Sequence, residues 1–542
     1  MGLKEPEYIT CDVLVIGSGA AGLEAAIRAR QQGASVLLVS KSQMGLGNNT
    51  ALAGAAFAAA TGERDASDNP DMHKKDIMEG GRFINDPNLV RKFTQRIVGE
   101  VSLLQKYGVP FQKDGERLSI SRAPGHSYPR HFYGEKRIGT VFTLPLKEYA
   151  AKTGVSFMER VFISRLLTKN GEVAGAVGID RGGRLLIFQA QVIVLATGGA
   201  GQVYLHTNNA VGMTGDGYAL GFHTGVPLRD MEFVQFYPTA ILGIRMIIYE
   251  TFVFRYGAII RNSHGEDVIV KHGLQDPMLM TRDRLAQAMM RELLAGNDVD
   301  GGMIMDLNPL TDDTIHRLRH LLPASAPDEK REFIVAPTVH FTIGGLVTDA
   351  STSTGIPGLL ACGEVVGGAH GANRLAGNAL SECFAMGALA GESAAHQAKE
   401  TPPRKPDPAE IDAEKARLES LLGEEQGNTR DLLRSLKEVT WLKVGIIRNQ
   451  SGLMDARDKI KDLRSRAGMV RTADIKSLIS RLELDNMLLV ADMITRAALE
   501  RKESRGAHFR EDYPDEDADW QANLFITNKQ GEIALEKKPA VL

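Results

Sequence analysis

The chain has 542 residues, of which 43% are hydrophobic, so it can bury large cores, and its length favours three or four domains. Its 64 Lys and Arg nearly balance its 67 Asp and Glu, which gives no indication of binding to nucleic acid or to an anionic membrane. The three cysteines, Cys11, Cys362 and Cys383, form no CxxC pair, which argues against a disulfide framework, a zinc site or a self-contained iron–sulfur cluster.

The start of the chain shows no targeting signal. Residues 1–17 lack a basic stretch followed by an apolar signal core, and no apolar run approaches the length that spans a bilayer. We therefore expect a cytoplasmic protein without a membrane span.

The first predicted unit is a strand, a helix and a second strand. Residues 12–17 are typical of a short buried strand, residues 19–30 of an Ala-rich helix and residues 35–40 of the next strand. A GxGxxG motif between the first strand and the helix consists of Gly17, Gly19 and Gly22. Such glycines permit a tight turn, a close approach of the backbone to a pyrophosphate, and close packing of the helix on the strand. The helix N-terminus would then offer free N–H groups to the phosphates.

A second strand followed by glycines lies at 192–201, with the sequence VIVLATGGAG. Two such turns on one chain indicate one large, bent dinucleotide in an interrupted domain, which predicts FAD. In NAD enzymes an acidic residue follows the second strand and binds the ribose, whereas this chain has Ser40 and Lys41 there. That difference argues against ordinary NAD binding, although Lys41 would suit the 2′-phosphate of NADP as an alternative.

The remaining segments differ in pattern. Residues 45–60 are small, which fits either backbone passing close to a flat ring or the start of an Ala-rich helix. Residues 155–195 alternate as strands with polar turns, which predicts an antiparallel β insertion. Residues 230–344 are mixed α/β without a phosphate turn, and residues 411–502 have helical periodicity.

These patterns predict an α/β fold with a two-part FAD-binding Rossmann-like domain, an inserted α+β capping domain and a C-terminal helical bundle domain. The predicted limits are 1–235 for the first part of the FAD-binding domain, 236–344 for the capping domain, 345–400 for the second part, 401–410 for a Pro-rich linker, 411–515 for the helical domain and 516–542 for a C-terminal tail.

Several longer motifs resemble the fumarate reductase/succinate dehydrogenase flavoprotein family, which includes L-aspartate oxidase. They are TGDG at 214–217, MEFVQFYPT at 231–239, HFTIGGLVTD at 340–349, CGEVVGGAHGANRLAGNAL at 362–380 and ESRGAHFREDYP at 503–514. Two more lean towards the aspartate oxidase-like members, namely GHSYPR at 125–130 and TWLKVGIIRNQSGL at 440–453. The resemblance covers nearly the whole chain and implies FAD as the cofactor.

The resemblance also implies how FAD is held. Glu364 matches the acid that holds the FAD ribose, and the family's covalent attachment His falls at Asn49, so we expect a non-covalent flavin. Asp216, Asn378 and Leu380 match positions that line the flavin. Together with the glycine turns, the expected cofactor contacts are Gly17, Gly19, Ala20, Gly22, Ser40, Lys41, Asn49, Thr50, Gly54, Gly198, Asp216, Glu364, Arg374, Asn378 and Leu380.

A carboxylate site is implied as well, with several departures from the family. His340 and Arg374 match a His and the carboxylate-binding Arg, whose planar guanidinium meets a carboxylate bidentately. Glu250 matches the Glu of a Thr-Glu pair, whereas Tyr249 replaces the Thr. Tyr237 stands where the family has a His.

The proton donor is the largest departure. The Arg thought to deliver the proton in fumarate reduction falls at Gln287, which is neither a cation nor a useful proton donor. Arg284 and Arg291 lie one turn either side of it on the same helix face, so either of them, or Tyr237, is an alternative donor. Both arginines can equally belong to a solvated helix face. The Glu that meets the substrate amine in aspartate oxidase is Ala123 in this chain.

The sequence therefore predicts an FAD-dependent oxidoreductase that transfers hydride between flavin N5 and a carbon adjacent to a carboxylate, interconverting C–C single and double bonds. Because Tyr237, Tyr249 and Phe341 make the site larger and more aromatic, we expect a small carboxylate other than plain fumarate or aspartate. Two alternatives stay open: an L-aspartate or amino-acid oxidase, against which Ala123 argues, and an electron-transfer subunit with an iron–sulfur or ferredoxin-like partner. The candidate catalytic residues are His340, Arg374, Tyr237, Glu250 and Gln287.

Overall fold

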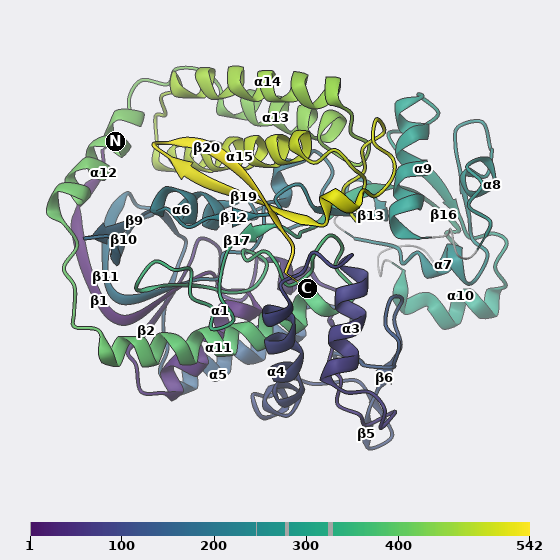
Figure 1. Cartoon of the computed structure of the whole chain (residues 1–542), viewed down its shortest axis with the longest axis horizontal. Helices are drawn as coiled ribbons and strands as arrows, with labels where there is room; N and C mark the ends of the chain where they lie inside the picture. The colour runs from purple at the N-terminus through teal and green to yellow at the C-terminus, as the bar shows by residue number, and fades with distance from the viewer. Residues whose placement is uncertain (1, 245, 277–280, 323–328, 542) are drawn as a thin grey trace.

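The computed structural model describes residues 2–244, 246–276, 281–322 and 329–541. The chain builds a body around a large sheet, a smaller unit at one end with a sheet of its own, and a layer of C-terminal helices over the body (Figure 1). This arrangement matches the predicted α/β fold class, in which a dinucleotide-binding domain is interrupted by a capping unit and followed by helices.

A seven-stranded sheet forms the centre of the body, in the order β8-β2-β1-β11-β10-β9 with β18 paired to β11. Its strands are β1 (Lys4–Ile16), β2 (Val36–Ser40), β8 (Ser156–Glu159), β9 (Val161–Lys169), β10 (Glu172–Asp180), β11 (Arg184–Leu195) and β18 (Leu359–Ala361). β9, β10 and β11 form the predicted antiparallel part. β1 runs parallel to both β2 and β11, so that Ile16 lies opposite Val39 and Leu195. The two glycine turns therefore leave the sheet at the same edge.

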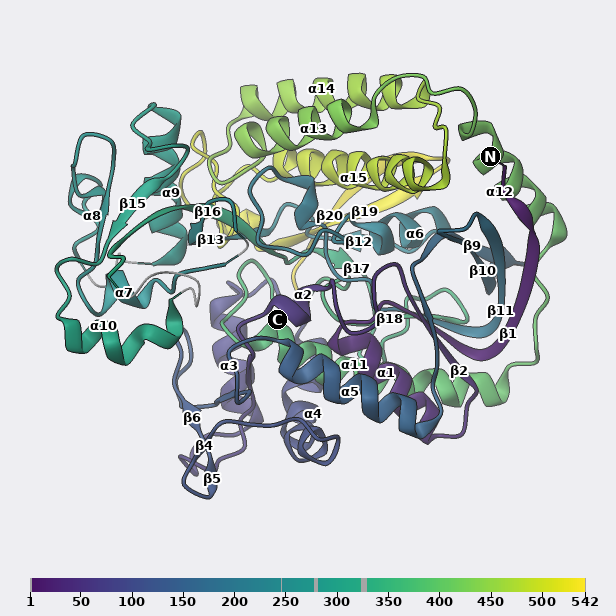
Figure 2. The ribbon, with the colours of Figure 1, turned by 180° about the vertical axis from the view of Figure 1, so that it is seen from behind.

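Three helices cover one face of this sheet, as Figures 1 and 2 show, namely α1 (Ala20–Gln31), α5 (Thr140–Thr153) and α11 (Asn378–Glu400). α1 and α11 come close together because glycines face backbone at their contact. A Cβ on Gly387 would lie 2.6 Å from the carbonyl oxygen of Ala21, and one on Gly391 would lie 2.2 Å from that of Ala25. The small residues of both helices thus let the two distant parts of the body pack as one unit.

Shorter elements complete the body. Two further helices, α3 (Pro70–Gly80) and α4 (Pro87–Lys106), begin with a capping Asn69 or Asp86 and a proline at the first helical position. The others are α2 (Asn49–Leu52), β3 (Ala56–Ala58), β4 (Lys113–Asp114), β5 (Arg117–Leu118), β6 (Ile120–Ser121), β7 (His131–Tyr133) and α6 (Asp216–Thr224).

The capping unit is built on a four-stranded antiparallel sheet in the order β13-β16-β15-β14. Its elements are β13 (Val234–Ile241), α7 (Thr251–Phe254), β14 (Ile259–Arg261), α8 (Val268–Lys271), α9 (Arg282–Leu294), β15 (Met303–Asp306), α10 (Asp312–Leu318) and β16 (Glu332–Thr342). The ends of β13 and β16 belong to the core of the body, through Val234, Phe236 and Val339, whereas their far halves pack in the core of the capping unit. Side chains midway along these two strands therefore sit at the junction of the two units.

Four helices follow α11, namely α12 (Pro408–Leu421), α13 (Thr429–Lys443), α14 (Gln450–Gly468) and α15 (Ile475–Glu500). α12 begins at Pro408, inside the stretch predicted as a linker, because Asp407 caps it and proline suits the first helical position. α13, α14 and α15 pack on one another, and α15 also packs on α6. Within the described ranges, no helix is both long enough and apolar enough to span a membrane.

A second four-stranded sheet joins distant segments in the order β17-β12-β19-β20. Its strands are β12 (Leu228–Arg229), β17 (Gly345–Leu346), β19 (Ala522–Lys529) and β20 (Glu532–Pro539). No element is predicted for 516–542 from the sequence, yet β19 and β20 form a hairpin that buries Leu524 and Ile526. Asp230 ties this hairpin to β12, since its carboxylate accepts hydrogen bonds from the backbone of Leu524 at 3.0 Å and from Asn523 Nδ2 at 2.8 Å.

Candidate functional site

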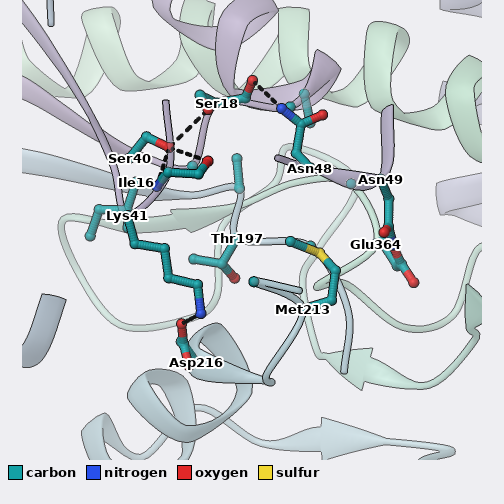
Figure 3. A pocket seen from close by; sticks show the side chains of 18 of the residues that line it. Ile16, Ser18, Ser40, Lys41, Asn48, Asn49, Thr197, Met213, Asp216 and Glu364 are labelled. Atoms are coloured by element: carbon teal, nitrogen blue, oxygen red, sulfur yellow. Dashed lines mark hydrogen bonds and ion pairs between the residues drawn. The ribbon is translucent and has the colours of Figure 1, made fainter. Parts of the chain in front are cut away.

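The two glycine turns form one wall of a pocket at the edge of the large sheet (Figure 3). Gly17 has a φ of 115°, and a Cβ there would lie 2.1 Å from the carbonyl oxygen of Ala196, in the second turn. A Cβ on Gly22 would lie 1.9 Å from the carbonyl oxygen of Gly17. Only glycine permits both approaches, which explains why the motif brings the ends of β1 and β11 against the start of α1.

The start of α1 is suited to an anion. Gly19, Ala20 and Ala21 line the pocket at this helix end. Its N-cap residue Gly19 supplies no side-chain cap, and its first turn has no acidic residue, although the N–H of Ala20 donates to Thr50 Oγ1 at 3.1 Å. The other N–H groups of the first turn and the positive end of the helix dipole are suited to a pyrophosphate.

One polar group in the pocket lacks a protein partner. Thr197 Oγ1 is buried and has no hydrogen-bond partner among the described residues, although Thr197 lines the pocket. A buried hydroxyl without a partner is costly, so a ligand atom that satisfies it fits this position. Together with the free helix end, this residue set fits a dinucleotide.

Asn49 occupies the position where the resemblance places a covalent attachment His. Its Nδ2 donates to Glu364 Oε2 at 3.0 Å and to Asn209 Oδ1 at 3.0 Å, and its Oδ1 accepts from the backbone of Ala210 at 3.0 Å. Figure 3 shows Asn49 beside Glu364 at the edge of the pocket. An amide offers no nucleophile for a flavin bond, and here it orients the carboxylate of Glu364 instead. Burial raises the pKa of Glu364 above its usual value.

Lys41 is neutralised rather than free for a phosphate. Its Nζ lies 2.6 Å from Asp216 Oδ2 and 2.9 Å from Glu483 Oε1, and it also donates to Thr214 Oγ1 at 2.6 Å. Figure 3 shows the Lys41 side chain pointing at Asp216. Two carboxylates on one ammonium leave a net negative charge, which disfavours the 2′-phosphate of NADP. Glu483 comes from α15, so the C-terminal helices contribute directly to this edge of the pocket.

Most of the predicted cofactor contacts line the pocket, namely Gly17, Gly19, Ala20, Ser40, Lys41, Asn49, Thr50, Gly198, Asp216 and Glu364. Five others lie outside it. Gly22 packs against Gly17, and a Cβ on Gly54 would lie 2.5 Å from the Tyr249 hydroxyl oxygen. Arg374 belongs to the cluster described next. The last two lie at the start of α11, where Asn378 Oδ1 bonds His73 Nε2 at 3.0 Å and Leu380 is part of the core.

A cluster of polar side chains, which we call the substrate cluster, lies at the junction of the body and the capping unit and consists of Tyr237, Glu250, Arg282, His340 and Arg374. Arg282, the first residue of α9, donates from Nε to Glu250 Oε1 at 2.7 Å, and its guanidinium carbon lies 5.0 Å from the centre of the Tyr237 ring. The Tyr237 hydroxyl donates to Glu250 Oε2. Burial, followed by the charge of Glu250, raises the pKa of Tyr237 well above its usual value, so the phenol stays neutral.

Asn208 faces His340 Nδ1, with its Nδ2 at 3.0 Å and its Oδ1 farther away at 3.4 Å. Asn209 Nδ2 donates to Asn208 Oδ1 at 3.2 Å and to the carbonyl oxygen of His340 at 3.0 Å, which leaves Asn208 Nδ2 as the donor to the ring. Nδ1 therefore accepts and Nε2 carries the hydrogen. Burial, followed by the charges of Arg374 and Arg282, lowers the pKa of His340 well below its usual value, so the ring is a neutral donor. Its centroid lies 5.5 Å from that of Tyr237.

Arg374 is a buried cation without a counter-ion. The residue is 6% exposed, and its guanidinium carbon lies 4.9 Å from the centre of the Phe341 ring. Nη1 donates to the carbonyl oxygen of Leu375 at 3.2 Å, but Nε has no hydrogen-bond partner and no carboxylate pairs with the side chain among the described residues. Burial, followed by the charge of Arg282, lowers the pKa of Arg374 to about 10. A carboxylate ligand would supply the missing partner.

Gln287 does not lie in the substrate cluster. It lines a separate cleft with Arg284, Arg291 and residues of the loop at 504–516. Arg282 lies in the substrate cluster instead, so the structure does not bring the predicted residue, or the alternatives Arg284 and Arg291, to Glu250 and Tyr237. The physical reason is the helix period: five residues turn the side chain by about 140° and shift it by about 7.5 Å.

Several residues of the site were not predicted. Arg282 was detectable in principle, because it stands in the same run of arginines as Arg284 and Arg291. Asn208 and Asn209 belong to no motif, and their roles depend on contacts with a strand more than a hundred residues away. Glu483 likewise carries no local signal that it reaches the cofactor pocket.

Comparison with known proteins gives a consistent picture. Residues 12–380 match the family described as FAD binding domain, and residues 433–542 match the family described as fumarate reductase flavoprotein C-term. An uncharacterized FAD-dependent oxidoreductase of Methanocaldococcus jannaschii is 36% identical over 96% of both chains. One subunit of the fumarate reductase (CoM/CoB) of Methanothermobacter marburgensis is 34% identical over 97% of this chain and 98% of its own. Among solved structures, an Escherichia coli quinol fumarate reductase variant superimposes with a TM-score of 0.89 at 29% identity, covering 98% of this chain and 97% of that one.

Proposed function

This chain belongs to the fumarate reductase/succinate dehydrogenase flavoprotein family and is an FAD-dependent oxidoreductase, and on that premise we propose that it interconverts a C–C single and double bond next to a carboxylate. The flavin, when bound, supplies or accepts the hydride at N5. The residues of the chain bind the carboxylate, orient the bond and move the proton.

The unpaired guanidinium of Arg374 is the observation that carries this proposal. A buried cation without a counter-ion is destabilising unless an anion binds it. The neutral imidazole of His340, on β16, offers its Nε2–H and would donate to the same carboxylate. A carboxylate held by these two groups would be polarised, which favours negative charge developing on the neighbouring carbon as hydride arrives.

Arg282 is the proposed proton carrier. Burial acts against its charge, but the carboxylate of Glu250 outweighs this effect and raises the pKa of Arg282. Glu250 orients the guanidinium through Nε and holds it beside Tyr237. In the reducing direction one proton would pass from this side of the cluster to the second carbon of the double bond, so that hydride and proton together complete the saturated product.

The partner for electrons is proposed to be another polypeptide. Within the described part of the chain, the three cysteines belong to no group of side chains that could hold a metal. Several relatives carry the name flavoprotein subunit, and the Methanothermobacter protein is likewise named as one subunit of its enzyme. We therefore expect an iron–sulfur or ferredoxin-like protein to exchange electrons with the flavin.

Anaerobic reoxidation of the flavin tests this function. The FAD-loaded protein is photoreduced, unsaturated acids are added one at a time, and the return of the oxidised flavin spectrum is followed. We expect recovery with at least one unsaturated carboxylate, a rate lower by about a thousandfold in Arg374→Met, and an unchanged rate in Arg284→Met, whose side chain lines the other cleft. A reduced flavin that oxygen reoxidises but no unsaturated acid does would contradict the proposal.

A further inference from the structure

We infer that the substrate cluster takes a monocarboxylate whose far end is neutral and donates a hydrogen bond, and that Tyr237 sets this specificity. The inference rests on the proposed function and names its substrate class. Some hydrogen-bond donors and charges of the cluster already have partners within the protein, and the inference follows from those that remain.

The single hydroxyl hydrogen of Tyr237 is already used. It is donated to Glu250 Oε2, while Arg282 holds the other carboxylate oxygen. The phenol is 3% exposed and stays protonated, so its oxygen offers only lone pairs to a ligand. A substrate group that meets Tyr237 must therefore donate a hydrogen bond rather than accept one.

The charges of the cluster balance one carboxylate and no more. Arg282 and Glu250 form an ion pair and cancel each other. His340 and Tyr237 are neutral, which leaves Arg374 as the unpaired positive charge of the cluster. The charges of Glu364 and Glu382 act to raise the pKa of Arg374, and being negative they give no further cation for a substrate carboxylate. A second substrate carboxylate would have no cation left to pair with it.

The position of that second group is also unfavourable for an anion. Tyr249 lies beside Glu250 in the chain, and its hydroxyl oxygen is 2.5 Å from where a Cβ on Gly54 would be. Burial raises its pKa, so it is a second neutral phenol. An anion near Glu250 is repelled by its carboxylate, whereas an amide N–H or a hydroxyl would be attracted to the lone pairs of Tyr237.

The matched substrates are fumarate and its monoamide, which have the same length and the same trans double bond but differ in the charge and donor at one end. Crotonate is the third substrate, because its far methyl is neutral but donates nothing. The readout is the second-order rate of anaerobic flavin reoxidation in the FAD-loaded protein. We expect the monoamide to react faster than fumarate by at least about tenfold, and faster than crotonate by a similar factor.

Variants at Tyr237 test its role. In Tyr237→His the imidazole can donate to a carboxylate, so the ratio of the monoamide rate to the fumarate rate should fall by at least about tenfold. Tyr256→Phe, in the capping unit and outside the cluster, should keep the wild-type ratio. Flavin content is measured for each variant so that a folding defect is recognised, and the wild-type ratio alone decides if Tyr237→His fails to fold.

The results distinguish a failure of this inference from a failure of the proposed function. If fumarate reacts as fast as its monoamide or faster in the wild type, the inference is overturned while the proposed function stands. A crotonate rate equal to that of the monoamide overturns the requirement for a donor. If no unsaturated acid reoxidises the flavin, the proposed function fails and the inference fails with it.

Discussion

Replacing Arg374 with methionine should stabilise the FAD-loaded protein while slowing its reaction with unsaturated acids by about a thousandfold. Folding lowers the pKa of Arg374 to about 10, which corresponds to a cost of about 3 kcal/mol for keeping the side chain charged. Because the folded pKa is the lower one, this cost is present at every pH well below 10 and is relieved only above it. Methionine keeps the apolar stem, but the contact with the Phe341 ring, worth about 1 kcal/mol, is lost.

The expected net gain in the free energy of unfolding is therefore about 1–2 kcal/mol, or about 1–2 °C in apparent Tm for a chain of this size. Thermal unfolding of the ligand-free, FAD-loaded protein, followed by circular dichroism between about pH 6 and 9, measures it. Arg284→Met, at an exposed arginine of α9, is the control and should change stability by less than about 0.5 kcal/mol. If Arg374→Met melts below the wild type with the same flavin content, the reasoning that Arg374 lacks a counter-ion is refuted.

Four other predictions address the cofactor and the proton. Arg282→Gln should slow anaerobic flavin reoxidation by about 100-fold or more, because it removes the cation that carries the proton. In the control variant Gln287→Ala the rate should stay within about twofold of the wild type. Equal losses of rate in both variants would count against placing the donor at Arg282. Acid precipitation should release all of the flavin into the supernatant, since Asn49 offers no nucleophile, and yellow colour retained in the pellet would contradict this. Glu483→Gln removes one of the two carboxylates on Lys41, so we expect the rate of FAD release, followed by flavin fluorescence, to rise by a few fold; an unchanged rate would show that α15 does not help to hold the cofactor. The pKa of His340 lies well below 6.5, so the ring is neutral at higher pH. Its protonation should therefore cause no change in the reoxidation rate between about pH 6 and 8. A change of rate in that range that disappears in His340→Gln would contradict the neutral ring.

The cofactor half of the site could be predicted from the sequence because its signals are local. Gly17 and Gly22 are needed for contacts within one strand–turn–helix unit, and the second turn repeats the same pattern. The pairing of Ile16 with Leu195 then follows from the rule that parallel strands bring their carboxyl ends to one edge. Contacts of this kind join residues that are close in the sequence, so a short motif predicts them.

The substrate half was less predictable because its geometry is long-range. A position transferred by resemblance must be correct to within one residue on a helix, and the difference between Arg282 and Gln287 exceeds a full turn. The tautomer of His340 depends on Asn208 and Asn209, whose amides are ordinary in sequence. The hairpin of β19 and β20 was missed because β20 is polar and because β19 pairs with β12, which lies about 300 residues earlier in the chain.

The same hairpin imposes an order on biosynthesis. β12 leaves the ribosome about 300 residues ahead of β19, which at roughly 5–20 residues per second amounts to roughly 15–60 s of translation. Throughout that interval one edge of β12 has no strand partner. The Asp230 carboxylate likewise lacks the hydrogen bonds that Leu524 N–H and Asn523 Nδ2 later donate. A nascent chain interrupted before residue 522 would keep this edge exposed, and it should be a preferred client of chaperones and proteases.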